Sequence, residues 1–83
     1  MAAWTVLYQD ALGAWESAEQ REPDEVVAVL GWLLEVVDRG PPDGCLPIPL
    51  TEDLYLGRVE GTGVYVTFLA LVYERRVVVR SIG

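Results

Sequence analysis

Hydrophobic residues follow a strand-like spacing at the start of the chain and a helix-like spacing after it. Residues 3–8 are rich in β-branched and aromatic side chains and are short enough for one strand. An apolar side chain at every third position then predicts a first helix over residues 10–20. A stronger 3.6-residue period predicts a second helix over residues 23–38, which Pro23 begins and Gly40 ends.

The second half of the chain predicts a loop followed by strands. Residues 40–50 hold four of the five prolines, which lack the amide hydrogen that regular structure needs. Three apolar side chains of this loop are expected to pack along one edge of the core: Leu46, Ile48 and Leu50. Strand-like runs follow at residues 53–60, 64–73 and 75–82.

The order of these elements is β-α-α-β-β-β. Helices and strands segregated in this way are typical of an α+β domain. The sequence therefore predicts one domain over residues 1–83, with two helices packed on one face of a four-stranded, mainly antiparallel sheet.

Charge is unevenly distributed along the chain. The whole net charge of −7 lies in residues 1–43, whereas residues 44–83 carry four acids and four arginines. Proteins that bind nucleic acids usually carry a basic excess, because they neutralise phosphates. The composition therefore argues against tight, non-specific binding of RNA or DNA. The hydrophobic content of 52% indicates that some apolar surface faces a partner protein.

Cys45 is the single cysteine, and the chain contains no histidine. An intramolecular disulfide is excluded, no zinc-site spacing is present, and Cys45 is expected to be a passive thiol. No phosphate-binding or dinucleotide-binding motif occurs. We therefore expect neither a metal nor a cofactor. No apolar run is long enough to span a membrane and the N-terminus does not read as a signal peptide, so a cytoplasmic protein is expected.

Three segments of the second half together resemble the RelE/ParE toxin superfamily. Residues 54–61, Leu-Tyr-Leu-Gly-Arg-Val-Glu-Gly, are similar to the second strand of that family. Residues 64–68 and 77–83 are similar to its third and last strands. The resemblance implies a toxin fold and a cognate antitoxin-like partner. It also implies either ribosome-dependent RNA cleavage or, as in ParE-type members, binding of DNA gyrase.

Two departures from the family pattern weigh against RNA cleavage. Ribonuclease members carry a Tyr-Arg-Val step in the third strand, where this chain has Val64-Tyr65-Val66. Those members also continue beyond the final glycine with further functional side chains, and the sequence stops at Gly83. The resemblance therefore implies the fold and an antitoxin-like partner more strongly than it implies cleavage of RNA.

Residual cleavage of RNA would need a base and positive charge on the phosphate. Four residues are candidates for these roles: Arg58, Glu60, Arg76 and Arg80. Strand alternation places Arg76 and Arg80 on the same face of the last strand, and Arg58 and Glu60 on the same face of the strand at residues 53–60. If both pairs lie on the open side of the sheet, the three arginines would form one patch. The alternative is that these charges only solvate the outer face of the sheet.

Four other residues are candidates for binding: Trp32, Tyr65, Val78 and Ile82. Trp32 lies toward the polar side of the second helix and is expected to be exposed, as a partner contact. Val78 and Ile82 are expected to make the open face of the sheet apolar. Tyr65 is suited to stack on a nucleobase, although cross-strand packing is the commoner role.

Three functions remain open at this point. The first is a toxin component that binds a macromolecular target and is neutralised by a partner protein. The second is a non-toxic interaction module that self-associates through its sheet, for example as a homodimer. The third is a weak ribosome-dependent endoribonuclease.

Overall fold

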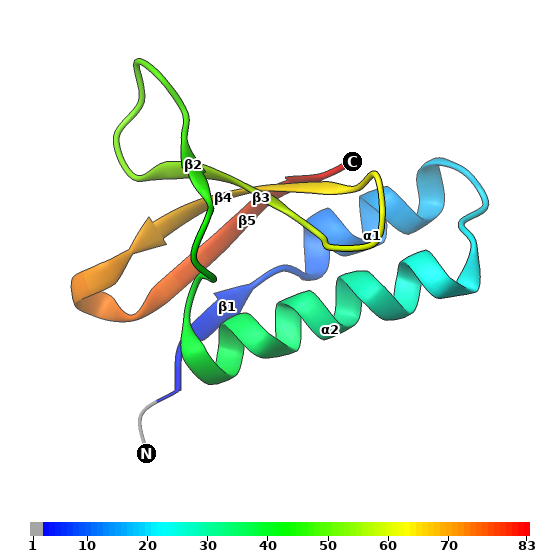
Figure 1. Cartoon of the computed structure of the whole chain (residues 1–83), viewed down its shortest axis with the longest axis horizontal. Coiled ribbons are helices and arrows are strands. Elements are labelled where there is room, and N and C mark those ends of the chain that lie inside the picture. Colours follow the sequence, from blue (N-terminus) through cyan, green and yellow to red (C-terminus); the bar gives the residue numbers. More distant parts are fainter. Residues whose placement is uncertain (1–2) are drawn as a thin grey trace.

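The computed structural model describes residues 3–83, which form two helices and a five-stranded sheet (Figure 1). The elements in chain order are β1 (Thr5–Leu7), α1 (Gln9–Ala18), α2 (Pro23–Arg39), β2 (Leu46–Pro47), β3 (Leu54–Arg58), β4 (Tyr65–Leu71), the short 3₁₀ helix η1 (Val72–Glu74) and β5 (Arg76–Ile82). The α+β class and the order of the predicted elements are confirmed.

The strands are arranged in the order β1-β5-β4-β3-β2. β1 pairs with β5 in parallel, and every other pair is antiparallel. The prediction of four strands was wrong by one, because Leu46 and Pro47 form a short edge strand on β3. Proline is tolerated at an edge, where one side of the strand needs no hydrogen bond. The amide of Ile48 extends this ladder by donating to the carbonyl of Leu54 at 3.0 Å.

α2 begins and ends where the sequence predicts. Pro23 occupies the first turn, and Gly40 ends the helix with φ +83° while its amide donates to the carbonyl of Val36 at 2.8 Å. A side chain at Gly40 would also collide with the ring of Trp4, whose atoms lie 2.5–2.8 Å from the position of a Cβ. Glycine is therefore required at this position both for its backbone conformation and for packing.

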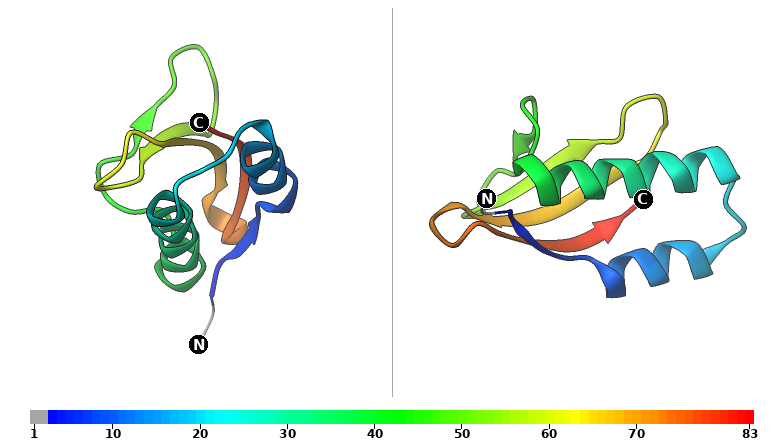
Figure 2. Two further views of the ribbon diagram at one scale, coloured as in Figure 1. Left: turned by 90° about the vertical axis from the view of Figure 1, so that its right-hand side faces the viewer. Right: turned by 90° about the horizontal axis from the view of Figure 1, so that it is seen from below.

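Both helices lie on one face of the sheet (Figure 2), and one hydrophobic core lies between them and that face. Ala11 and Trp15 of α1 join Val29, Leu33 and Val36 of α2 in this core. The sheet contributes the alternate residues Val66, Phe68 and Ala70 of β4 together with Val77 and Val79 of β5. Since side chains alternate along a strand, the opposite face of the sheet points away from both helices.

The loop between β2 and β3 projects from the molecule at the top of Figure 1. Leu46 is 64% exposed and Leu50 is fully exposed, so the prediction that they pack along the core was wrong. Pairing with Leu56 turns Leu46 onto the face away from the helices, and Leu50 stands in the loop with φ +65°. Ile48 alone of the three predicted residues is partly buried.

A β-bulge in β5 changes which face its last residues occupy. Thr67 pairs with Ser81, whereas the next residue, Phe68, pairs with Val79, so Arg80 is the extra residue. The bulge shifts the alternation by one position. Ile82 therefore lies beside Val66 in the core and is 8% exposed. The prediction that Ile82 shares the open face with Val78 was wrong for this reason.

Candidate functional site

The sheet face that points away from the helices is the candidate site, and we call it the open face. Its residues, assigned from strand register and alternation, are Thr5, Leu7, Leu46, Leu54, Leu56, Arg58, Tyr65, Thr67, Leu69, Leu71, Arg76, Val78, Arg80 and Ser81. No helix of residues 3–83 covers this face. It combines exposed or half-buried apolar side chains with arginines, a composition typical of interaction surfaces.

An apolar stripe crosses the middle of the open face. Leu54, Leu69, Val78 and Leu7 are direct neighbours on the four adjacent strands β3, β4, β5 and β1. Adjacent strands are about 4.8 Å apart, so this stripe is about 14 Å long. Leu7, at one end of the stripe, is 48% exposed. Tyr65 lies outside the stripe, four residues before Leu69 on β4, and is 42% exposed.

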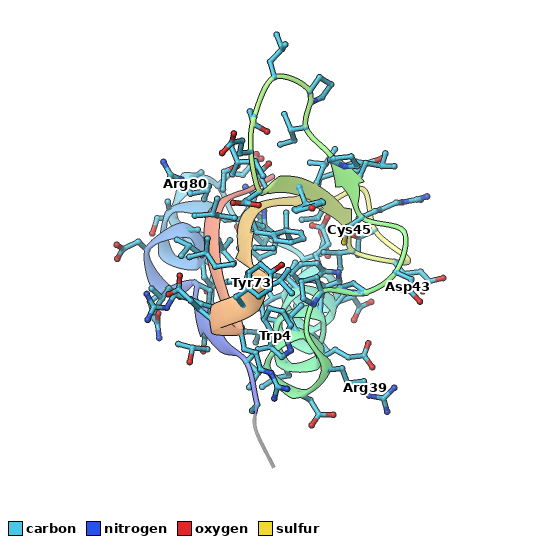
Figure 3. All side chains as sticks on the ribbon, turned by 90° about the vertical axis from the view of Figure 1, so that its left-hand side faces the viewer. Trp4, Arg39, Asp43, Cys45, Tyr73 and Arg80 are labelled. Carbon is cyan, nitrogen blue, oxygen red and sulfur yellow. The ribbon has the colours of Figure 1, made fainter. Side chains whose placement is uncertain are left out.

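Arginines lie at the two ends of the strands, beyond the stripe. Arg58 lies opposite Tyr65 and Arg76 lies opposite Leu71. Since Tyr65 and Leu71 are six residues apart on β4, the two arginines are separated by about 20 Å along the strand direction. Arg80, the bulged residue, lies between them on β5, next to the Ser81 that pairs with Thr67, and is labelled in Figure 3. Arg58 and Arg76 share one face but are too far apart to contact one phosphate.

The candidate base Glu60 lies near only one of the arginines: it lines a cleft together with Arg58, whereas Arg76 lies at the far end of the strands. Glu60 is exposed and lies beyond the end of β3, in the turn toward β4. Arg76 forms an ion pair with Glu74 at 3.5 Å, in which both side chains are about half exposed. No charged side chain of residues 3–83 is buried. Arg58, Glu60 and Arg76 therefore do not surround one common point.

Trp32 does not lie on the surface as predicted. It is partly buried against the core, with its ring 5.7 Å from the ring of Phe68. The space for the indole exists because Gly57 of β3 has no side chain: a Cβ there would lie 2.7 Å from Cζ2 of Trp32. A glycine inside a strand is a known signal of such a close approach, and it points to this slot.

A cleft of about 500 Å³ lies beside Trp32, between α2, the loop at residues 42–45 and the end of β3. Cys45 lines this cleft, and partial burial, followed by the charge of Asp43, raises the pKa of its thiol. Both effects disfavour the thiolate, which is the reactive form. No cluster of metal-binding side chains occurs among residues 3–83.

Most of the apolar stripe was not predicted from the sequence. Leu54 follows from alternation along β3, once its partner strand is known. Leu7 joins the stripe only because β1 pairs in parallel with β5, about seventy residues later in the chain. Such a distant pairing leaves no local signal in the sequence.

The structure matches a double arginine-to-alanine mutant of the E. coli toxin RelE in the free state, with a TM-score of 0.67 over 100% of this chain and 83% of that one. The chain has the RelE fold. Sequence identity to RelE is 18%, so the match shows the fold alone. No family sequence model and no curated protein sequence matches this chain.

The RelE fold confirms the resemblance drawn from residues 54–83. The two helices and the five-stranded mixed sheet of this chain all lie within the part that matches the RelE structure. Neither helix among the described residues has the length and apolar character needed to cross a bilayer.

Proposed function

We propose that this chain is the toxin component of a toxin–antitoxin pair, and that it acts by binding a macromolecular target through its open face. The observation that carries the proposal is the open face itself, an apolar stripe with Arg58, Arg80 and Arg76 spread along the strands around it. The RelE fold adds weight, since the matching protein is a toxin.

A partner protein that neutralises the toxin would cover the same face. Apolar side chains of the partner would pack on the stripe, and its carboxylates would pair with the arginines. The partner segment is therefore expected to be amphipathic and acidic. The proposal places the chain and its partner in the cytoplasm.

RNA cleavage is a weaker candidate. A cleavage site brings its base and its phosphate-binding cations within hydrogen-bonding reach of one phosphodiester. Here Arg58 and Arg76 are about 20 Å apart along the strands, and Glu60 lies in an exposed turn.

The test is bacterial growth after induction of the chain alone. Wild type should arrest growth, the triple variant Arg58→Ala, Arg76→Ala and Arg80→Ala should not, and Arg39→Ala should arrest it as wild type does. Arg39 is the control because it is 76% exposed on α2, away from the open face (Figure 3). Uninhibited growth with folded, expressed wild type would overturn toxicity, and equal arrest by the triple variant would overturn the role of the arginines.

A further inference from the structure

The outer surface of α2 carries an exposed apolar stripe of its own. Val27 is 69% exposed, Leu30 is 38% exposed and Leu34 is 68% exposed. Their spacing of three and four residues places them along one side of the helix. None of them belongs to the buried core, which α2 contacts through Val29, Leu33 and Val36. α2 therefore has two apolar sides, and the structure covers one of them.

The charges around this helix stripe are acidic. Asp24 lies three residues before Val27 and Asp38 lies four residues after Leu34, so each end of the stripe carries a carboxylate. Both are exposed, and Glu35 adds a third exposed carboxylate nearby. The one cation in this region, Arg39, forms a loose, exposed ion pair with Asp38 at 3.6 Å. An apolar centre with acids at both ends is the reverse of the open face, where arginines stand beyond an apolar centre.

The two patterns also agree in size. Asp24 and Asp38 are fourteen residues apart, which is about 21 Å along the helix axis. Arg58 and Arg76 are about 20 Å apart along the strands and two strand spacings apart across them, which is about 22 Å in all. In this register the helix stripe, about 10 Å long, would lie over the middle of the sheet stripe.

We propose that α2 of one copy of this chain docks on the open face of a second copy. The docked helix would cover the open face from outside, as α1 and α2 of the same chain cover the opposite face from inside. The alternative two-fold arrangement, with open face on open face, would set arginines against arginines and is disfavoured. The contact is head-to-tail, so a dimer keeps one free open face, on the copy whose helix is docked, and one free helix stripe, on the other copy.

The association is expected to be weak. One helix lying on a four-stranded stripe buries less than the roughly 1,600 Å² of a standard stable interface, and the net charge of −7 on each copy opposes assembly. The contact is therefore expected in the micromolar range or weaker. The proposal goes beyond the toxin function and does not rest on it, because its test uses purified protein alone.

Two variants separate head-to-tail docking from every other assembly. Leu34→Asp breaks the helix stripe and leaves the open face intact, whereas Leu7→Asp breaks the sheet stripe and leaves α2 intact. Both side chains are substantially exposed, so the core is unaffected. Val72→Asp is the matched control, since Val72 is 61% exposed at the β4–β5 turn, away from both stripes. Far-UV circular dichroism checks that each variant is folded.

The measurement is sedimentation equilibrium from about 10 μM to about 1 mM protein, which brackets the expected affinity. Wild type and Val72→Asp should rise with concentration from 9.2 kDa past the mass of a dimer. Each stripe variant alone should stay monomeric, and their equimolar mixture should form a 1:1 dimer and grow no further. The proposal is overturned if wild type is monomeric throughout, if either stripe variant alone associates as wild type does, or if the mixture stays monomeric.

Discussion

Replacing Gly57 by alanine tests the position of Trp32, which sequence reasoning placed wrongly. A Cβ at residue 57 would lie 2.7 Å from Cζ2 of Trp32 and 3.3 Å from both Sγ of Cys45 and Cε1 of Phe68. On one side the indole packs against Phe68, which is fully buried, so it could give way only toward the cleft that it lines. Some atoms must therefore shift to admit one methyl group.

The expected cost follows from two opposing effects. Overpacking a closely packed site typically costs about 1–3 kcal/mol. Alanine in a strand recovers about 0.5–1 kcal/mol relative to glycine, since the unfolded chain loses freedom. The difference between the two effects is about 0–2.5 kcal/mol. Because the approach of 2.7 Å to Trp32 forces atoms to shift, we expect Gly57→Ala to lower the free energy of unfolding by about 1–2 kcal/mol, which corresponds to roughly 4–16 °C in Tm for a domain of this size.

Urea denaturation followed by far-UV circular dichroism measures this change. Gly31→Ala is the matched control: no atom lies within 4 Å of its added methyl group on α2, so it should stabilise the protein by about 0.5–1 kcal/mol. In a Trp32→Leu background, Gly57→Ala should cost less, because the closest colliding atom is gone. Two results would contradict the packing of Trp32 against Gly57. One is a Gly57→Ala protein as stable as wild type, and the other is an equal loss of unfolding free energy in the wild-type and Trp32→Leu backgrounds.

Three further predictions concern stability. Because the bulge turns Ile82 into the core, Ile82→Ala should lower the free energy of unfolding by about 2–4 kcal/mol in urea denaturation. Val78→Ala, on the open face, should lower it by less than about 1.5 kcal/mol, and equal losses would contradict the shifted register. Because burial raises the pKa of the Cys45 thiol, the folded state holds this proton longer than the unfolded state. Wild type should therefore lose stability relative to Cys45→Ala as pH rises above about 8.5 in thermal denaturation, and parallel pH profiles would exclude the effect. Gly40→Ala should lower Tm by more than Gly57→Ala, since it adds a positive φ to a collision with Trp4, and a smaller loss would argue against that packing.

Local patterns predicted much of the fold. The period of α2, the proline before it and the glycine after it mark its two ends almost to the residue. Alternation along β4 separates its buried from its exposed side chains, because the strand is regular and half-buried. These signals lie within single segments, so one sequence is enough to detect them.

The errors arise where distant segments meet. Ile82 was assigned to the open face because nothing local marks Arg80 as a bulged residue. Trp32 was assigned to the surface because its helix position looks polar, whereas its place is set by Gly57 on another element. Leu46 was assigned to the core because apolar residues are usually buried, and its exposure follows from pairing with Leu56. The candidate site depends on these pairings and is therefore less predictable than the helices.

The central claim is that the open face is the surface through which this chain acts. Photocrosslinking in cells tests it most directly, with p-benzoylphenylalanine at Tyr65 on the open face or at Tyr73 in the β4–β5 turn. Both tyrosines are exposed, and both substitutions keep an aromatic ring. A crosslinked target or partner from position 65 and none from position 73 is the predicted result. Crosslinks from position 73 alone would contradict the account.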